Sequence, residues 1–356
     1  MFLLFIFKML KPKAKGLFID ISEFSIFAAR TSGFKLPIKV EQVADFPISG
    51  DCRPEDVRAF LESLIDFKGN KYYIARCGVY PKDRFIHHHE VESLAKIKRQ
   101  DSLQKLLVSE YNIELGSNSV SILNANDGAD FNSTGNTSKQ MVFCGAPVTS
   151  LQETQDQVLS YGLYPERLEL SSVTTLGGLC DYTRFIGFES SVIYIELASE
   201  SIFVSILNKG SVVMTRMLSF GLNSIFPVLQ QELELKDEAS ARKLFYTNTF
   251  NFAEMGKRLL LPILKELQSI SGYYEVHTGL TIDNVFIGVL PNTLNWVSRT
   301  ISESLGFEAI QPDMEPWLKS LQVEFSGDTE LSNLESGWLG VFSLMGEFNL
   351  RDTTTG

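Results

Sequence analysis

Cysteine, histidine and tryptophan are scarce in this chain of 356 residues, which contains four, four and three of them. The cysteines lie far apart and form no Cys-x-x-Cys pair; they are Cys52, Cys77, Cys144 and Cys180. A zinc site or a disulfide framework needs closer spacing or a small, cysteine-dense domain. We therefore predict no metal site and four reduced core thiols in a cytoplasmic protein.

Positive charge and long apolar runs are also lacking. Lys and Arg total 32 against 43 Asp and Glu, and a net charge of −11 argues against a general nucleic-acid binder. The apolar run at residues 1–10 is too short to cross a bilayer, which takes about 20 residues. Lysines follow this run instead of preceding it, unlike in a signal peptide. Either Met9 is the true start, which we favour, or the segment is an interfacial anchor with lysines facing lipid headgroups.

Common catalytic motifs are absent as well. The sequence has no Gly-x-Ser-x-Gly elbow, Walker loop or Gly-x-Gly-x-x-Gly fingerprint. Histidines occupy positions 87–89, but adjacent side chains of a strand point to opposite faces, so we predict a surface turn instead of a metal site. The pair Gly177 and Gly178 is interpreted as a small-residue turn. We predict no catalytic residue.

What the sequence does contain is a mixture of strand and helix patterns. In the first part, strands are predicted at residues 16–21, 25–31, 40–46 and 72–79, and helices at 54–67 and 150–162. Between them, residues 81–149 have a different texture: a charged helical stretch at 90–110, strands at 119–123 and 140–146, and a polar tract at 124–139 predicted to be a mobile loop. This part is interpreted as an inserted subdomain.

The second part repeats the opening of the first. Residues 17–21 and 193–197 are both predicted strands that contain one acid, and each precedes a tight turn and an antiparallel partner strand. Helices are predicted at 222–235, 237–247, 254–274 and 293–305, with strands at 284–290 and 308–311; Pro262 should kink the third helix unless it begins near Leu261. The repetition predicts a duplicated α/β fold with a cleft between its halves.

These features, in this order, resemble the actin-like ATPase superfamily, whose halves are ribonuclease H-like. Within it the chain is similar to PilM-like proteins of type IV pilus assembly, with FtsA-like proteins and the cytoplasmic part of GspL as relatives. Four segments support the resemblance, at residues 9–21, 160–170, 264–274 and 338–345. It implies one actin-like domain at 9–80 and 150–188, the insertion at 81–149, and a second domain at 189–345 whose last helix packs back on the first.

The resemblance also implies a function. PilM-like proteins are cytoplasmic adaptors, held at the inner membrane through partners, that bind the amino-terminal cytoplasmic peptide of the bitopic membrane protein PilN. We therefore expect a PilN-like partner, other pilus or secretion components, and no nucleic acid. The resemblance places the candidate peptide surface on the insertion and the adjoining face of the first domain, at Arg84, Phe85, Ile86, Val120, Ile122 and Gly145.

An actin-like nucleotide site needs glycine in its phosphate hairpins, because backbone N–H groups must approach the phosphates, and an aspartate in each hairpin to hold Mg²⁺. In the first hairpin, Asp20 is retained but Ser22 replaces the glycine. In the second, Glu196 replaces the aspartate and Ala198 replaces the glycine. The nucleoside turn retains a single glycine, Gly288.

Glu23 and Glu200 add further negative charge to the hairpins, where a triphosphate would lie. We therefore predict a vestigial site and no cofactor. The main alternative is a nucleotide-dependent ATPase switch that binds Mg-ATP, with Asp20 and Glu196 around the metal and Gly288 beneath the adenine. An acid–base or metal centre built from the four acids is less favoured. An FtsA-like polymer would need a carboxy-terminal membrane helix, for which residues 348–356 are too short and polar.

Overall fold

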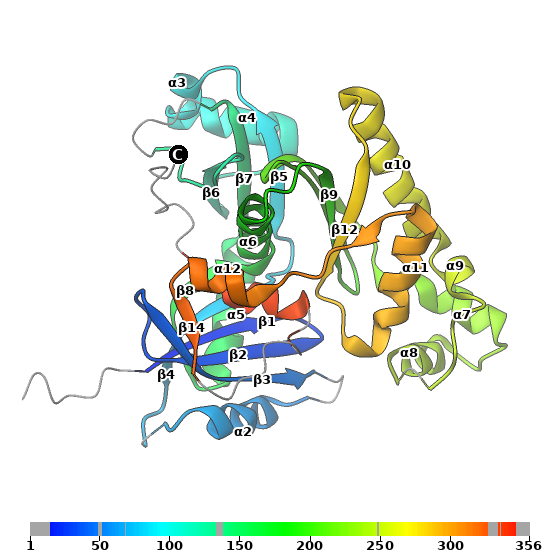
Figure 1. Ribbon diagram of the computed structural model, residues 1–356, viewed down its shortest axis with the longest axis horizontal. Coiled ribbons are helices and arrows are strands. Elements are labelled where there is room, and N and C mark those ends of the chain that lie inside the picture. Colours follow the sequence, from blue (N-terminus) through cyan, green and yellow to red (C-terminus); the bar gives the residue numbers. More distant parts are fainter. Residues whose placement is uncertain are drawn as a thin grey trace, which may run out of the picture.

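The computed structural model describes residues 15–48, 52–67, 69–132, 138–247, 249–326, 334 and 336–346. These residues form three β-sheets with helices packed against them (Figure 1). The sequence-based expectations for the start of the chain, for the centre of the polar tract and for residues 348–356 lie outside the described residues. Within the described part, no helix combines the length and the hydropathy required to span a membrane.

The first sheet has the strand order β14-β3-β2-β1-β4-β8. Its strands are β1 (Gly16–Ile21), β2 (Ser25–Thr31), β3 (Ile38–Pro47), β4 (Tyr73–Val79), β8 (Leu163–Leu170) and β14 (Val323–Phe325). One face packs against α2 (Pro54–Leu64) and α5 (Val148–Ser160), and the other against α6 (Ser171–Phe185) and α13 (Leu339–Ser343). Strand β1 follows this division, since Leu17 and Ile19 belong to the first of these cores and Phe18 to the second.

The second sheet has the order β11-β10-β9-β12-β13. Its strands are β9 (Ser191–Leu197), β10 (Ile202–Asn208), β11 (Ser211–Leu218), β12 (Ile282–Gly288) and β13 (Glu308–Ala309). Strand β9 pairs antiparallel with β10 and parallel with β12, just as β1 pairs antiparallel with β2 and parallel with β4. The predicted duplication is therefore confirmed in the topology.

Helices cover the second sheet: η1 (Leu222–Ile225), α7 (Phe226–Glu232), α8 (Glu238–Thr247), α9 (Gly256–Leu259), α10 (Leu261–Thr278) and α11 (Asn295–Leu305). The stretch predicted as one helix at 254–274 is two helices. Pro262 stands in the first turn of α10, where its missing N–H costs nothing, so it begins the helix and does not kink it.

The insertion forms a third sheet of order β5-β7-β6. Its elements are β5 (Phe85–Glu90), α3 (Leu94–Ile97), α4 (Gln100–Tyr111), β6 (Asn118–Asn124) and β7 (Gln140–Pro147). The insertion also contacts the second sheet, because the His88 backbone N–H donates to the Thr215 hydroxyl (2.7 Å) and the Val212 N–H donates to the Ala125 carbonyl (2.9 Å). It therefore bridges the two halves.

Two sequence-based interpretations are corrected by the structure. Gly177 and Gly178 lie within α6 instead of in a turn, and a Cβ at Gly178 would collide with Ser343 of α13, so the glycine permits close helix packing. The histidines at 87–89 lie in β5 instead of a surface turn. The His87 ring stacks on Tyr111 with centroids 4.1 Å apart, and the His89 ring lies edge-on to the same tyrosine, so two of the three histidines pack against an aromatic side chain.

The last described elements of the chain pack against the first sheet. Helix α12 (Met314–Ser320) and strand β14, neither of which was predicted, follow the second half, and β14 pairs parallel with β3. Trp317 is fully buried, and its indole N–H donates to Asp181 of α6 (2.8 Å). Helix α13 then packs against α6 and β1.

Candidate functional site

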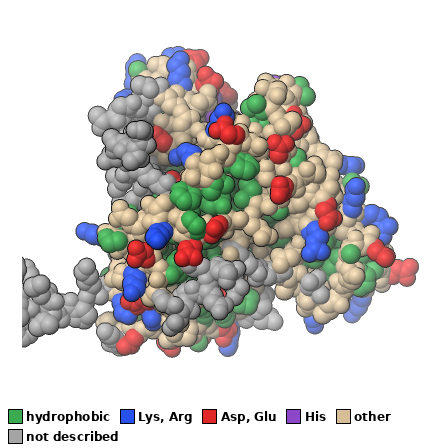
Figure 2. Space-filling model, viewed as in Figure 1, with side chains coloured by type: hydrophobic (Ala, Val, Ile, Leu, Met, Phe, Trp, Pro, Cys, Tyr) green, Lys and Arg blue, Asp and Glu red, His purple; other side chains and the backbone are tan. Residues whose placement is uncertain are grey.

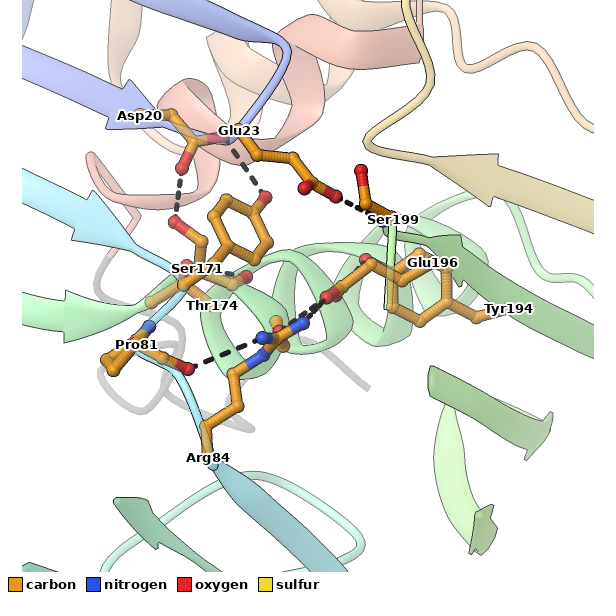
Figure 3. A network of polar contacts seen from close by, with 11 residues as sticks. Asp20, Glu23, Pro81, Arg84, Ser171, Thr174, Tyr194, Glu196 and Ser199 are labelled. Atoms are coloured by element: carbon orange, nitrogen blue, oxygen red, sulfur yellow. Dashed lines mark hydrogen bonds and ion pairs between the residues drawn. The ribbon is translucent and has the colours of Figure 1, made fainter. Parts of the chain in front are cut away.

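The two equivalent hairpins, β1–β2 and β9–β10, face each other across a cleft. A cavity of about 670 Å³ lies between them and is also lined by the segment that leads from β4 into the insertion. Figure 3 shows the polar side chains that meet here, which come from both hairpins, from the start of α6 and from the start of the insertion. The candidate site is this cleft.

Asp20, near the end of β1, is buried and bound by protein groups on both oxygens. The Ser171 hydroxyl at the start of α6 donates to Oδ1, and the Tyr80 hydroxyl donates to Oδ2 (3.3 Å). Burial raises the pKa of Asp20 to about 7, although these two hydrogen bonds lower it. A carboxylate that holds a metal through water must be ionised and accessible, and Asp20 meets neither requirement well.

Glu196 of β9 is fully buried and forms an ion pair with Arg84, whose side chain is 8% exposed. Ser172 and Tyr194 also donate to this carboxylate, at 3.0 Å and 3.3 Å. A buried carboxylate is tolerated only when it is paired and hydrogen-bonded, and both conditions are met here.

Arg84 is itself held on several sides. Its Nε donates to the Ser172 hydroxyl (2.9 Å), its Nη1 donates to the Pro81 carbonyl (3.4 Å), and its guanidinium lies 5.4 Å from the centre of the Tyr80 ring. In Figure 3 it reaches from the start of the insertion to the acid of the second half. The positive charge that balances the Glu196 carboxylate is therefore supplied by a protein side chain, that of Arg84.

The first hairpin uses its own serine to close its turn. The Ser22 hydroxyl accepts from the N–H groups of Phe24 (3.2 Å) and Ser25 (3.0 Å) and donates to the Ser25 carbonyl (2.9 Å). In the second hairpin the Ala198 N–H donates to the Ser201 carbonyl (3.0 Å). These backbone donors, which a glycine hairpin would offer to a phosphate, are already used within the turns.

A hydrogen bond also joins the two hairpins directly. The Glu23 carboxylate accepts from the backbone N–H of Ser199 at 2.5 Å, and burial raises the pKa of Glu23 against the effect of this bond. Glu200, the fourth predicted acid, is exposed and lies 3.9 Å from Lys82. The four acids therefore do not form one cluster, and no group of three metal-ligating side chains occurs among the described residues.

The space beside Gly288, where the resemblance would place a nucleoside, is nearly filled. A Cβ at Gly288 would lie 3.1 Å from the Tyr194 ring, and the cavity beside it, lined by Asp20, Tyr80 and Gly288, holds only about 20 Å³. Val289 has a φ of 63°, a left-handed conformation that strongly favours glycine. A ligand pocket usually holds roughly 300 Å³ or more, so the space beside Gly288 is too small for a nucleoside, whereas the cleft between the hairpins, at about 670 Å³, exceeds that size.

The structure brings together all five residues predicted for the vestigial site, Asp20, Ser22, Glu196, Ala198 and Gly288, around this cleft. It places Arg84, predicted to bind the partner, in the cleft as well. Sequence reasoning missed the roles of Tyr80, Ser171 and Ser172. No local pattern distinguishes these residues, since their meeting depends on the packing of α6 against both halves.

The other predicted partner-binding residues cluster on the insertion sheet. Gly145 of β7 lies between Phe85 of β5 and Val120 of β6 in the strand register. Phe85, Ile86 and Ile122 are buried and Val120 is half-buried, so most of these side chains pack inside the insertion. A peptide bound to this sheet would therefore contact few of these side chains.

A groove of about 470 Å³ lies beside this cluster, where the insertion meets the first domain. Its apolar lining comes from β6, β7 and α6, with charged residues from β8 and α6; the lining includes Leu123, Ala125, Val142, Val173, Leu176, Arg167, Glu169 and Arg184. We call it the insertion groove. In the space-filling view, apolar side chains also gather on the face around α6 (Figure 2).

No protein-family model and no curated protein matches this sequence. Among solved structures, the chain is similar to one described as a PilM–PilN type IV pilus biogenesis complex, with 12% identity, a TM-score of 0.67, and coverage of 94% of this chain and 98% of that one. A weaker similarity is to the ethanolamine utilization protein EutJ from Carboxydothermus hydrogenoformans (13% identity, TM-score 0.46, 94% and 90% covered). Another is to the cytoplasmic domain of EpsL, from the type II secretion system of Vibrio cholerae, with 13% identity, a TM-score of 0.36, and coverage of 60% of this chain and 74% of that one. With the duplicated hairpins, the first similarity confirms the actin-like α/β fold.

Proposed function

We propose that this protein is a scaffold of a type IV pilus or type II secretion-like assembly platform, which binds the cytoplasmic amino-terminal peptide of a PilN-like inner-membrane protein. The proposal is supported by the similarity over nearly the full length of both chains to a protein solved as a PilM–PilN complex. The contacts inside the cleft also support it, because they favour a binding protein over an ATPase.

The observation that favours a scaffold over an ATPase is the Arg84–Glu196 ion pair inside the cleft. In an actin-like ATPase the corresponding acid must be available to a hydrated metal. Here the guanidinium supplies the compensating charge, and the hairpin N–H groups are used internally. Binding of Mg-ATP would have to break these contacts and open the space beside Gly288, at a cost that phosphate contacts would need to exceed.

Titration calorimetry with Mg-ATP tests this part of the proposal. We expect no measurable heat of binding from the native protein. A variant with Ser22→Gly and Ala198→Gly, which restores glycine to both hairpins, is the comparison and is expected to bind more tightly than the native protein. Tight binding by the native protein would instead support the nucleotide-switch alternative, with Asp20, Glu196 and Gly288 as its site.

The insertion groove is the site that we propose for the peptide. Its apolar lining on both walls would cover side chains of an extended peptide, and Arg167 and Glu169 at its edge offer a donor and acceptors for polar groups. Val173 and Gly177, four residues apart on α6, are both partly exposed and line the groove. This position agrees with the peptide surface that the resemblance implies, because the groove adjoins the predicted insertion strands.

Val173→Glu is expected to weaken binding of such a peptide by at least about tenfold, because a carboxylate in the apolar groove would lose its hydration when the peptide covers it. The peptide would be synthesised from the cytoplasmic segment of the PilN-like protein encoded beside this one, and binding measured by fluorescence anisotropy. Val276→Glu is the matched control, since Val276 is 83% exposed on α10, away from the groove. Equal loss in both variants, or in neither, would contradict the assignment of the groove.

A further inference from the structure

The end of the first sheet at which β1 begins is formed by parts of the chain that are far apart in sequence. Strands β1, β4 and β8 run parallel, so their first residues lie at one end of the sheet, and β2 ends there. Hydrogen bonds tie this end together: the Tyr73 hydroxyl donates to the Lys15 carbonyl (3.2 Å), and the Tyr73 N–H donates to the Gly162 carbonyl (2.9 Å). At β14 and β3, the Ile38 N–H donates to the Gln322 carbonyl (2.9 Å).

This end of the sheet is rich in exposed lysine, although the whole chain has a net charge of −11. Lys15, Lys35, Lys71 and Lys319 are all exposed there. In the described part of the chain, Lys35, Lys71 and Lys319 form no ion pair, whereas the neighbouring carboxylates do take part in contacts. Glu41 binds Lys15 and Arg30, and Glu166 binds Arg76. Positive charge therefore remains in excess.

Large apolar side chains are exposed beside these lysines. Ile74 of β4 and Tyr164 of β8 are neighbours in the strand register, and each is more than half exposed, at 53% and 54%. Tyr72, just before β4, lies under the amino group of Lys71, which is 5.0 Å from the centre of its ring. A surface that combines exposed lysines with aromatic and aliphatic side chains has the composition of a membrane–water interface.

We propose that this surface, defined by Lys15, Lys35, Lys71, Lys319, Ile74 and Tyr164, binds directly to a lipid bilayer that contains anionic lipid. Lysines near an anionic bilayer each add to binding through the negative surface potential, and Ile74 and Tyr164 would enter the headgroup region. The sequence that leads into Lys15 continues the same composition, with Lys8, Lys11 and Lys13 next to apolar residues. The exposed apolar pair favours a bilayer over an acidic polymer, which would use the lysines alone.

Co-sedimentation of the full-length protein with vesicles tests this inference. We expect binding to phosphatidylcholine vesicles that contain phosphatidylglycerol, little binding to phosphatidylcholine alone, and a decrease as salt concentration rises. The double variant Lys35→Glu/Lys71→Glu should weaken binding by at least about tenfold, and Ile74→Glu should weaken it further. Lys243→Glu/Lys257→Glu is the matched control, because both lysines are exposed on or near the second half's helices α8 and α9.

Three results would overturn the inference: no binding to anionic vesicles, equal binding to both kinds of vesicle, or equal effects of the substitutions on this surface and of the control substitutions. The inference would also be overturned if binding survived the substitutions of Lys35, Lys71 and Ile74 but was lost when Lys8, Lys11 and Lys13 were replaced with glutamine. The segment before Lys15 would then bind the vesicles alone. The experiment contains neither peptide nor nucleotide, so its outcome is independent of the proposed scaffold function.

Discussion

Replacing Arg84 with methionine is expected to lower the free energy of unfolding by about 3–5 kcal/mol, the range found when one partner of a buried ion pair is removed. Glu196 would remain fully buried without its cation, retaining only the hydrogen bonds from Ser172 and Tyr194. The Ser172 hydroxyl would also lose the donor Arg84 Nε. Urea unfolding of native and variant proteins, followed by circular dichroism, measures the difference.

The control for this prediction is an exposed ion pair. Lys209 and Glu189 are 2.9 Å apart with side chains that are 66% and 78% exposed, so Lys209→Met should change stability by less than about 1 kcal/mol. A double variant, Arg84→Met with Glu196→Leu, should recover a large part of the loss, since no carboxylate is then left buried without its cation. If Arg84→Met costs no more than Lys209→Met, the cleft pair does not have the role assigned to it.

Arg84 also shows where sequence reasoning reaches its limit. The strands that contain Asp20 and Glu196 were predictable, because each is a short apolar run bounded by turn residues, and such patterns are local. Arg84 and Glu196 are separated by 112 positions, and only the placement of the insertion against the second sheet brings them together. The sequence correctly indicated acids in the hairpins and missed the cation that balances one of them.

The errors in secondary structure have a similar cause. Two adjacent glycines in α6 disfavour a helix locally, but the helix is buried between the halves, and Gly178 allows α13 to approach. Strand β14 has three residues and α12 has seven, too few for a periodic pattern to be distinguished. Their positions depend on Trp317, whose burial against Asp181 is a contact across 136 positions. Tertiary packing outweighed local preference in both places.

The ion pair in the cleft and the insertion groove are connected through the chain. Arg84 immediately precedes β5, the first strand of the insertion sheet, and the apolar walls of the groove come from that sheet and from α6. Ser172 of α6 contacts both Arg84 and Glu196. The contacts of Arg84 and Ser172 in the cleft therefore also fix the start of the insertion relative to α6. The proposed peptide site would need such a fixed geometry to be formed before the peptide binds.

The second large effect concerns pH, and it depends on Asp20. Its pKa is about 7 in the folded protein because of burial, compared with 3.8 for an unperturbed aspartate. The folded state therefore binds a proton that the unfolded state loses above about pH 4. The resulting stabilisation is fully present below the unfolded pKa and is lost as pH rises through 7. One pKa unit corresponds to about 1.4 kcal/mol, so the contribution of Asp20 falls by roughly 3 kcal/mol between about pH 5 and pH 8.

Asp20→Asn removes this titration while keeping the shape of the side chain, and its amide can still contact the hydroxyls of Ser171 and Tyr80. As the pH rises from about 5 to about 8, the free energy of unfolding of the variant should increase by roughly 3 kcal/mol relative to that of the native protein. Urea unfolding across this pH range measures the difference. Asp283→Asn, which removes an exposed carboxylate on β12, controls for the loss of one charge. Parallel stability curves for the native protein and Asp20→Asn would mean that Asp20 stays ionised in the fold. Its two hydrogen bonds would then outweigh its burial, and the carboxylate would be in the charged state that a hydrated metal requires.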